Sequence, residues 1–286
     1  MGEKGSRKLF FGLFIFPLLI ALGMAVLLCS VVLLTNERET PETLITAIKT
    51  GSPSKRWQKA FELSNELNQS SPSLRSESLM RESIHILKDS SHYDSKTRGY
   101  MALALGRFEH PDAVAALEKA LEDDNEDVRL YSLWALGTLR ATDAVPAIRP
   151  FLKSESEAER KMAVYVLGAM GDTASLPSIR PLLEDPIEDI RWNAALSLAR
   201  LGDESGSEIL AQMLDRESLS LDARRSEEDI EKIMINAAKG LALIHRPDSI
   251  KILKSLSSTD KNMKVRQAAL DAIRYQNENA SDKIKR

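Results

Sequence analysis

The sequence has 286 residues, of which 43% are hydrophobic and 28% are charged, with 13 Gly and 11 Pro. This length and composition exclude a disulfide-stapled mini-protein, a disordered chain and a collagen-like chain. Lys and Arg total 39 against 42 Asp and Glu, so there is no basic excess for a sequence-independent grip on phosphates, and we expect no nucleic-acid partner. The single cysteine, Cys29, excludes an intramolecular disulfide and a metal site with two thiolates.

The N-terminal part contains an uncharged apolar run over residues 9–34. At ~1.5 Å per residue, a helix of this length exceeds the ~30 Å hydrocarbon core of a bilayer. The run is longer than the ~7–15 apolar residues of a secretory signal peptide and lacks a small-x-small cleavage site. Basic residues are more frequent before it than after it. The sequence therefore predicts a single-pass membrane protein with a cytoplasmic segment 1–8 and an extracytoplasmic remainder, in the inner membrane if the source is bacterial.

Two transitional segments follow the apolar run. Residues 35–53 are predicted to form a linker with a short helix. Residues 54–91 carry spaced apolar side chains, among them Trp57 and Phe61, which indicate a degenerate repeat that caps a helical stack. At the other end of the chain, residues 277–286 are too polar to pack, and we expect a disordered tail.

Residues 92–276 repeat with a period of 31. Each copy contains an Arg, a Leu seven residues later and a Gly or Ala after that Leu; the arginines are Arg98, Arg129, Arg160 and Arg191. Apolar positions recur at spacings of three and four in both halves of a copy, so each copy reads as a first and a second helix. A fifth copy, with Lys232 in the Arg place and Gly240 in the small place, requires an insertion near 217–231. The sequence predicts an all-α stack from which this insertion bulges.

The segment NEDVRLYSLWALGTLRATDAVPAIRPFLK resembles the HEAT-like repeat named after the phycobilisome lyases. The resemblance is strong over 92–216 and weaker over 217–276. It implies a right-handed α-solenoid in which the second helices line the concave face. It indicates an architecture and not an activity.

We call the four arginines that recur with the 31-residue period the arginine column. They could bind a ligand, or they could have a structural role. We favour the structural interpretation, in which each Arg binds an acid of a neighbouring repeat or the open carbonyls at a helix end. A second pair, Arg149 and Arg180, occupies matching places in the second helices of adjacent repeats. We call this pair the two-Arg rung and predict that it binds an acidic segment of a partner protein. The alternative is that both are solvated surface charges.

Three aromatic residues, Trp134, Tyr165 and Trp192, lie on one flank of successive first helices. They indicate either a docking surface or packing between repeats. In the insertion, Arg224 and Arg225 precede a run of acids, which suits a partner contact and equally a flexible loop.

Catalysis has little support in the sequence. The four histidines show no metal-ligand spacing, and no Gly-rich phosphate loop or GxSxG elbow occurs. We therefore expect no metal, no cofactor and no enzymatic activity. The sequence predicts a membrane-anchored scaffold or adaptor that binds a membrane-associated protein through its solenoid. The alternatives are a bilin-lyase-like helper for cofactor attachment and an accessory subunit of a membrane transporter or complex.

Overall fold

The computed structural model describes residues 15–35, 40–69, 75–244 and 246–284, with the side chains of 31–35 and 279–284 excepted. Within these ranges every regular element is an α-helix or a short 3-10 helix, and no strand occurs. The predicted all-α repeat stack is therefore confirmed.

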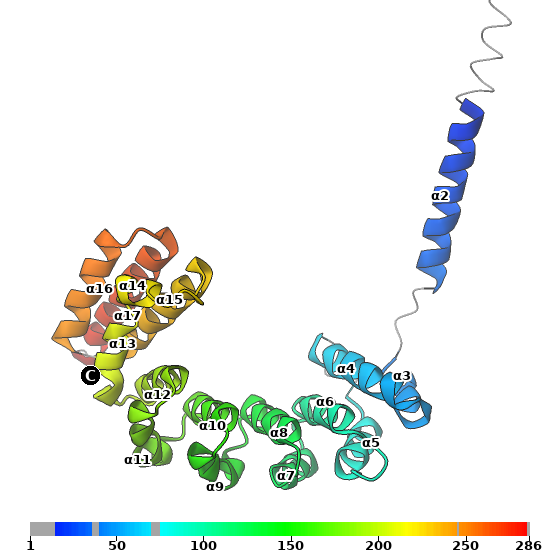
Figure 1. Ribbon diagram of the computed structural model, residues 1–286, viewed down its shortest axis with the longest axis horizontal. Helices are drawn as coiled ribbons and strands as arrows, with labels where there is room; N and C mark the ends of the chain where they lie inside the picture. The colour runs from blue at the N-terminus through cyan, green and yellow to red at the C-terminus, as the bar shows by residue number, and fades with distance from the viewer. Residues whose placement is uncertain (1–14, 36–39, 70–74, 245, 285–286) are drawn as a thin grey trace, which may run out of the picture.

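The helices form two rows, which Figure 1 shows one above the other from α5 to α12. We call the row that contains the predicted first helices the inner row, and it consists of α4 (Pro53–Gln69), α6 (Ser95–Leu105), α8 (Glu126–Leu139), α10 (Glu157–Met170), α12 (Glu188–Arg200), α15 (Glu227–Leu243) and α17 (Met263–Ile284). The outer row consists of α3 (Pro41–Thr50), α5 (Glu77–Lys88), α7 (Pro111–Ala120), α9 (Val145–Ile148) with η4 (Arg149–Lys153), α11 (Leu176–Ile179) with η6 (Arg180–Glu184), α13 (Ser207–Gln212) and α16 (Pro247–Thr259). Three single 3-10 turns, η3 (Thr142–Ala144), η5 (Thr173–Ser175) and η7 (Glu204–Gly206), precede α9, α11 and α13.

The ends of the inner helices follow from local side-chain chemistry. The side chains of Asn125 and Ser156 accept hydrogen bonds from the third residue of α8 and α10, which satisfies backbone donors that a helix start leaves open. Three successive inner helices are followed by a residue of positive φ, at positions 31 apart: Arg140 at 49°, Gly171 at 79° and Gly202 at 78°. Glycine adopts this left-handed conformation at little cost, whereas an arginine is strained in it.

Small residues bring successive inner helices close together. A Cβ added at Gly106 would lie 2.9 Å from the Cβ of Ala135 on the next inner helix. At Gly137 it would lie 2.9 Å from Val166, and at Gly168 2.9 Å from the Cα of Ser197. Close approach on this side curves the stack towards the inner row, and Figure 1 shows the C-terminal helices turning to that side. The expectation that the second helices line the concave face is therefore wrong.

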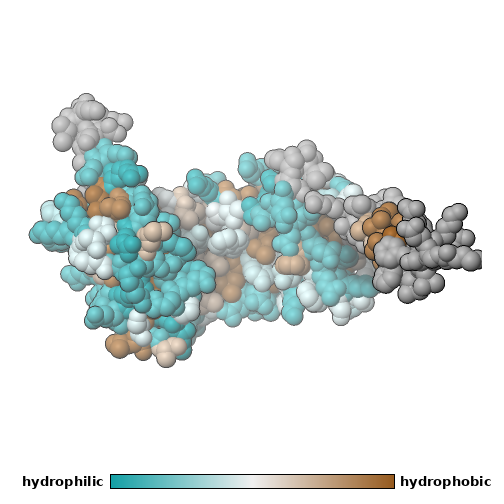
Figure 2. Space-filling model, turned by 90° about the horizontal axis from the view of Figure 1, so that it is seen from above, coloured by the Kyte–Doolittle hydropathy of each residue, from teal (hydrophilic) through white to brown (hydrophobic). Residues whose placement is uncertain are grey.

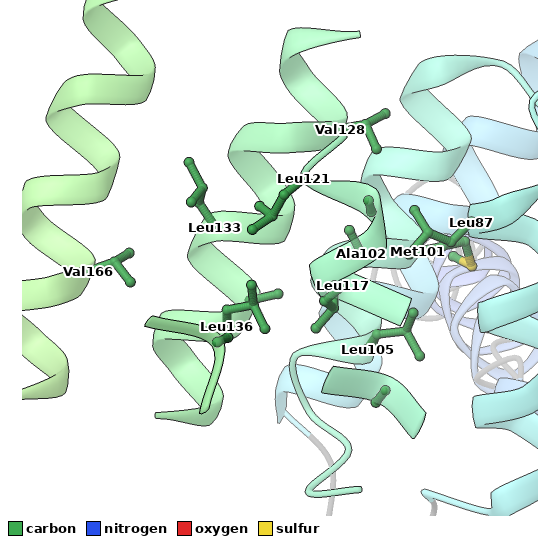
Figure 3. Packing of buried hydrophobic residues seen from close by; sticks show 14 of the residues in the cluster. Leu87, Met101, Ala102, Leu105, Leu117, Leu121, Val128, Leu133, Leu136 and Val166 are labelled. Atoms are coloured by element: carbon green, nitrogen blue, oxygen red, sulfur yellow. The ribbon is translucent and has the colours of Figure 1, made fainter. Parts of the chain in front are cut away.

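The buried side chains form two clusters that meet at α12. The first runs from Leu44 to Leu198, and Figure 3 shows part of it, with Leu105, Leu117 and Leu136 packed between α6, α7 and α8. The second contains Ala195 and Ala199 of α12 and continues through α13, α15, α16 and α17. At the same helix the direction of the stack changes (Figure 1). We therefore distinguish a regular stack, α5 to α12, from a C-terminal region, α13 to α17.

The segments outside the clear repeats also contain helices. Helix α3 lies inside the linker 35–53, for which the sequence predicted a short helix, and its buried Leu44, Ile45 and Ile48 join it to the core beside α4. At the C-terminal end, α17 continues to Ile284, so part of the segment predicted as a disordered tail, 277–286, is helical. Packing against a neighbouring helix stabilises a segment as short as α3, which is a weak helix alone.

The apolar run 9–34 corresponds in part to helix α2 (Phe16–Thr35), whereas residues 1–14 lie outside the described part of the chain. Among the described residues, no helix meets the length and apolarity that a membrane crossing requires. This finding contradicts the predicted transmembrane helix and single-pass membrane location.

Candidate functional site

Three arginines of the column, Arg98, Arg129 and Arg160, bind carboxylates outside their own helices, whereas Arg191 bonds to the carbonyl oxygens of Asp185 and Pro186. Arg129 donates from Nε to Glu159 Oε1 (2.6 Å) and from Nη1 to the carbonyl oxygen of Asp123 (2.7 Å). Arg160 repeats the pattern with Asp185 Oδ2 (2.8 Å) and the carbonyl of Ser154 (2.8 Å). Burial raises the pKa of the Asp185 carboxyl, but hydrogen bonds from Arg160 and from a backbone N–H outweigh it and leave the pKa below its ordinary value. These contacts support the structural interpretation of the column.

In the C-terminal region, Arg216 at the start of the insertion forms the ion pair that a column arginine forms in the regular stack. Arg216 opens the short helix α14 (Arg216–Ser220) and binds both carboxylate oxygens of Asp260, at 3.0 and 2.9 Å. Both side chains are largely buried. Lys232, expected in the Arg place, instead forms an exposed ion pair with Glu228 one turn earlier. The expected fifth-copy assignment of Lys232 is therefore wrong.

The predicted two-Arg rung lies on the outer row and is already paired. Arg149 donates to Ser175 Oγ (3.0 Å) and to Asp172 (3.3 Å). Arg180 donates from Nε to Asp203 Oδ2 (3.0 Å). Each carboxylate belongs to the turn after the next inner helix, so both arginines fasten neighbouring repeats together.

The insertion is fastened to α12 rather than free. Arg225 forms an ion pair with Glu188 and lies 4.9 Å from the ring centroid of Trp192. Arg224 is almost fully exposed and pairs with Asp222, whose carboxyl pKa the hydrogen bond from Arg224 holds well below its ordinary range. Trp192 and Arg225 border a hollow of about 520 Å³ at the bend of the stack.

The inner row carries a series of aromatic contacts. Trp134 stacks on Tyr165 with centroids 5.7 Å apart and planes at 11°, and Tyr100 stacks on Tyr131 at 5.9 Å and 23°. Phe61 meets Tyr100 edge to face at 5.3 Å. We call these five residues, contributed by α4, α6, α8 and α10, the aromatic row. Trp192 does not join these stacks and contacts Arg225 instead.

Sequence reasoning missed three members of the aromatic row, although the repeat contained a signal for two of them. Tyr100 and Tyr131 each stand two residues after a column arginine, so the 31-residue period places them at the same point on adjacent helices. Phe61 lies in the degenerate first pair, where no column arginine marks the register.

Figure 2 looks down on the inner side, where apolar patches lie along the middle of the molecule between hydrophilic borders. Within the aromatic row, Phe61 and Trp134 are 44% and 40% exposed. A hollow of about 170 Å³ lies between Trp134 and Tyr165, lined also by Gly137, Thr138, Val166 and Ala169.

A larger hollow of about 530 Å³ lies between α15 and α17. Its wall is mainly apolar and includes Ile235, Leu243 and Met263, with Lys239 at the hollow as well. In the part of the chain that the structure covers, no three potential metal ligands converge.

The family of HEAT repeats matches residues 84–162 and 145–231. No curated protein sequence matches the chain. The complex of CpcE and CpcF of phycocyanin lyase from Nostoc sp. PCC7120 is similar in structure, with a TM-score of 0.56 and 20% identity over 84% of this chain and 96% of that one. The Escherichia coli protein YibA is similar with a TM-score of 0.53 and 12% identity over 83% and 93%. At these identities the similarities concern the fold.

Proposed function

The chain belongs to the HEAT-repeat family, and from that premise we propose that it is a non-catalytic scaffold that binds another protein through its aromatic row. The observation that carries the proposal is a set of aromatic side chains on the concave side, in two groups of touching rings, of which Phe61 and Trp134 remain two-fifths exposed.

Packing between repeats accounts for only part of this surface. The core positions of the same helices, such as Leu133 and Leu136, are fully buried, whereas Phe61 and Trp134 keep large apolar surfaces in water. Large aromatic side chains supply much of the binding energy at protein interfaces because they bury a large area and lose little conformational entropy. Solenoids present extended concave surfaces to such partners.

The test is affinity capture from the source cell with the full chain as bait, read by quantitative mass spectrometry. A Trp134→Ala variant is compared with Phe151→Ala on the outer row, which removes a similarly large aromatic group away from the aromatic row. We expect one or a few proteins to be captured by the wild type and by the Phe151 variant, and at least tenfold less by the Trp134 variant. Equal capture by all three would contradict the proposal, provided that circular dichroism shows that all three are folded.

A second candidate function is a helper for cofactor attachment. The apolar hollow of about 530 Å³ between α15 and α17 favours it, because small-molecule sites have volumes of ~300–1,000 Å³. The similarity to the phycocyanin lyase complex adds support. This function predicts a visible absorbance band in the purified chain after expression with tetrapyrrole synthesis, and a Leu243→Asp change in the hollow should remove it. A colourless protein would count against this candidate.

A further inference from the structure

We infer that Trp134, Tyr165 and Arg200, which we call the anchor of the aromatic row, bind an acidic segment of the partner protein. This partner segment carries an apolar side chain two residues from a carboxylate. The inference rests on the proposed function and specifies the chemistry of the partner.

The three side chains come from successive inner helices and touch in sequence. Trp134 on α8 stacks on Tyr165 on α10, and the Arg200 guanidinium at the end of α12 lies 5.5 Å from the same tyrosine ring. Tyr165 contacts both of the other side chains, and its helix α10 lies between α8 and α12 (Figure 1). Trp, Tyr and Arg are the residue types most enriched among interface hot spots.

The size of the hollow between Trp134 and Tyr165 selects the ligand class. Its volume of about 170 Å³ is below the ~300–1,000 Å³ of sites that enclose a small molecule. The hollow is lined by these two aromatic side chains together with Gly137, Thr138, Val166 and Ala169. The hollow therefore suits a single apolar side chain presented by a larger partner.

Arg200 supplies the charge. It is exposed, and no carboxylate among the described residues pairs with it. The acids in the turns that follow α10 and α12, Asp172 and Asp203, are already bound by Arg149 and Arg180. The neighbouring Arg225 is bound by Glu188, and the column arginine of the same helix, Arg191, bonds to helix-end carbonyls. Arg200 thus keeps its donors available beside an apolar hollow, and guanidinium groups bind carboxylates in a two-pronged geometry.

The spacing of the anchor indicates the spacing in the partner. In an extended segment, side chains two residues apart point the same way and lie roughly 7 Å apart. The Tyr165 ring lines the hollow, and its centroid lies 5.5 Å from the Arg200 guanidinium, so both contacts fall within reach of neighbouring side chains of one short partner segment. An apolar residue and an Asp or Glu separated by one residue therefore match the site.

The experiment is selection of a phage-displayed random 12-residue peptide library on the full chain, with individual winners measured by fluorescence anisotropy. We expect enriched peptides to share an apolar residue two positions from an Asp or Glu. Arg200→Glu should weaken their binding at least tenfold and enrich peptides with Lys or Arg in place of the acid. Lys153→Glu, the same charge change on the outer row, should leave binding unchanged.

Three results would overturn the inference: no enrichment, enrichment without an acid preference, or equal binding of the winners to the Arg200→Glu variant. The proposed function is judged separately by the capture experiment with Trp134→Ala. If the Trp134 variant loses capture but the selected peptides show no preference for an acid, the scaffold function is supported and the acidic partner segment is rejected.

Discussion

The regular stack and the C-terminal region meet the same physical requirement in two ways. In the stack, an arginine at a fixed position of the inner helix binds the acidic turn of a neighbouring repeat, as Arg160 binds Asp185. In the C-terminal region the inner helix α15 lacks this arginine, and Arg216, at the start of the insertion, reaches Asp260 from another point in the chain. What the fold requires is a guanidinium beside a buried carboxylate, because an unpaired buried charge is costly. The position of that guanidinium in the sequence is free to change.

The two regions also differ in the surface that they present. The stack shows stacked aromatic rings with a small hollow, whereas the C-terminal region shows a larger aliphatic hollow between α15 and α17. This difference is the reason for assigning the protein-binding role to the stack. The following predictions test how separate the two regions are.

The largest effect is expected from a cavity in either core. Leu167 in the stack and Leu241 in the C-terminal region are both buried, and replacing either by Ala should lower the free energy of unfolding by ~2–5 kcal/mol. Because the two cores meet at α12 and at Leu183 of η6, hydrogen exchange should rise mainly in the region that carries the change. Urea unfolding and hydrogen-exchange mass spectrometry measure the two quantities. Equal loss of protection in both regions would mean that they form one cooperative unit.

An intermediate effect is expected at the contact made by the insertion. Arg216→Ala should lower the free energy of unfolding by ~1–3 kcal/mol, since it leaves the buried Asp260 carboxylate without its partner. Lys232→Ala, at the position where the sequence predicted the column residue, should leave the stability nearly unchanged, because its ion pair with Glu228 is exposed to solvent. Thermal unfolding of both variants decides between the two positions. A larger loss in the Lys232 variant would reverse the assignment.

The smallest effect is expected within the stack, at the end of α8. Arg140 has a φ of 49° where the next two repeats have glycine. Arg140→Gly should therefore stabilise the protein by about 0.5–1 kcal/mol by removing backbone strain. Calorimetry should show a raised melting temperature, while Gly171→Arg should lower it. A lowered melting temperature for the Arg140 variant would show that its side chain contributes more than the strain costs.

Much of the fold could be predicted because the repeat is regular from Arg98 to Leu214. Identical spacing of an Arg, a Leu and a Gly or Ala over four copies leaves one register for the helices, and the contacts of Arg129 and Arg160 agree with it. The register is lost after α12 because the insertion removes the period. In α15 the buried residue that precedes the column position is Ile230, as Val128 is in α8, so Glu231 and not Lys232 occupies that position.

The candidate site was predicted only in part. Trp134 and Tyr165 were identified from their common place in the repeat, and the structure brings their rings together. Trp192 and the pair Arg149 and Arg180 were equally plausible in the sequence, but the structure gives each of them a partner within the chain. Arg200 could not be distinguished from the other arginines, because its lack of a carboxylate partner depends on which acids the outer row already binds.

The sequence by itself determined the helical class, the 31-residue period and the residues that join one repeat to the next, because these depend on contacts at fixed spacings along the chain. Only the tertiary structure decided which row is concave, which arginine reaches Asp260 and which side chains remain available to a partner. These properties depend on how closely neighbouring helices approach and on competition among side chains far apart in the sequence, and neither is encoded in local spacing.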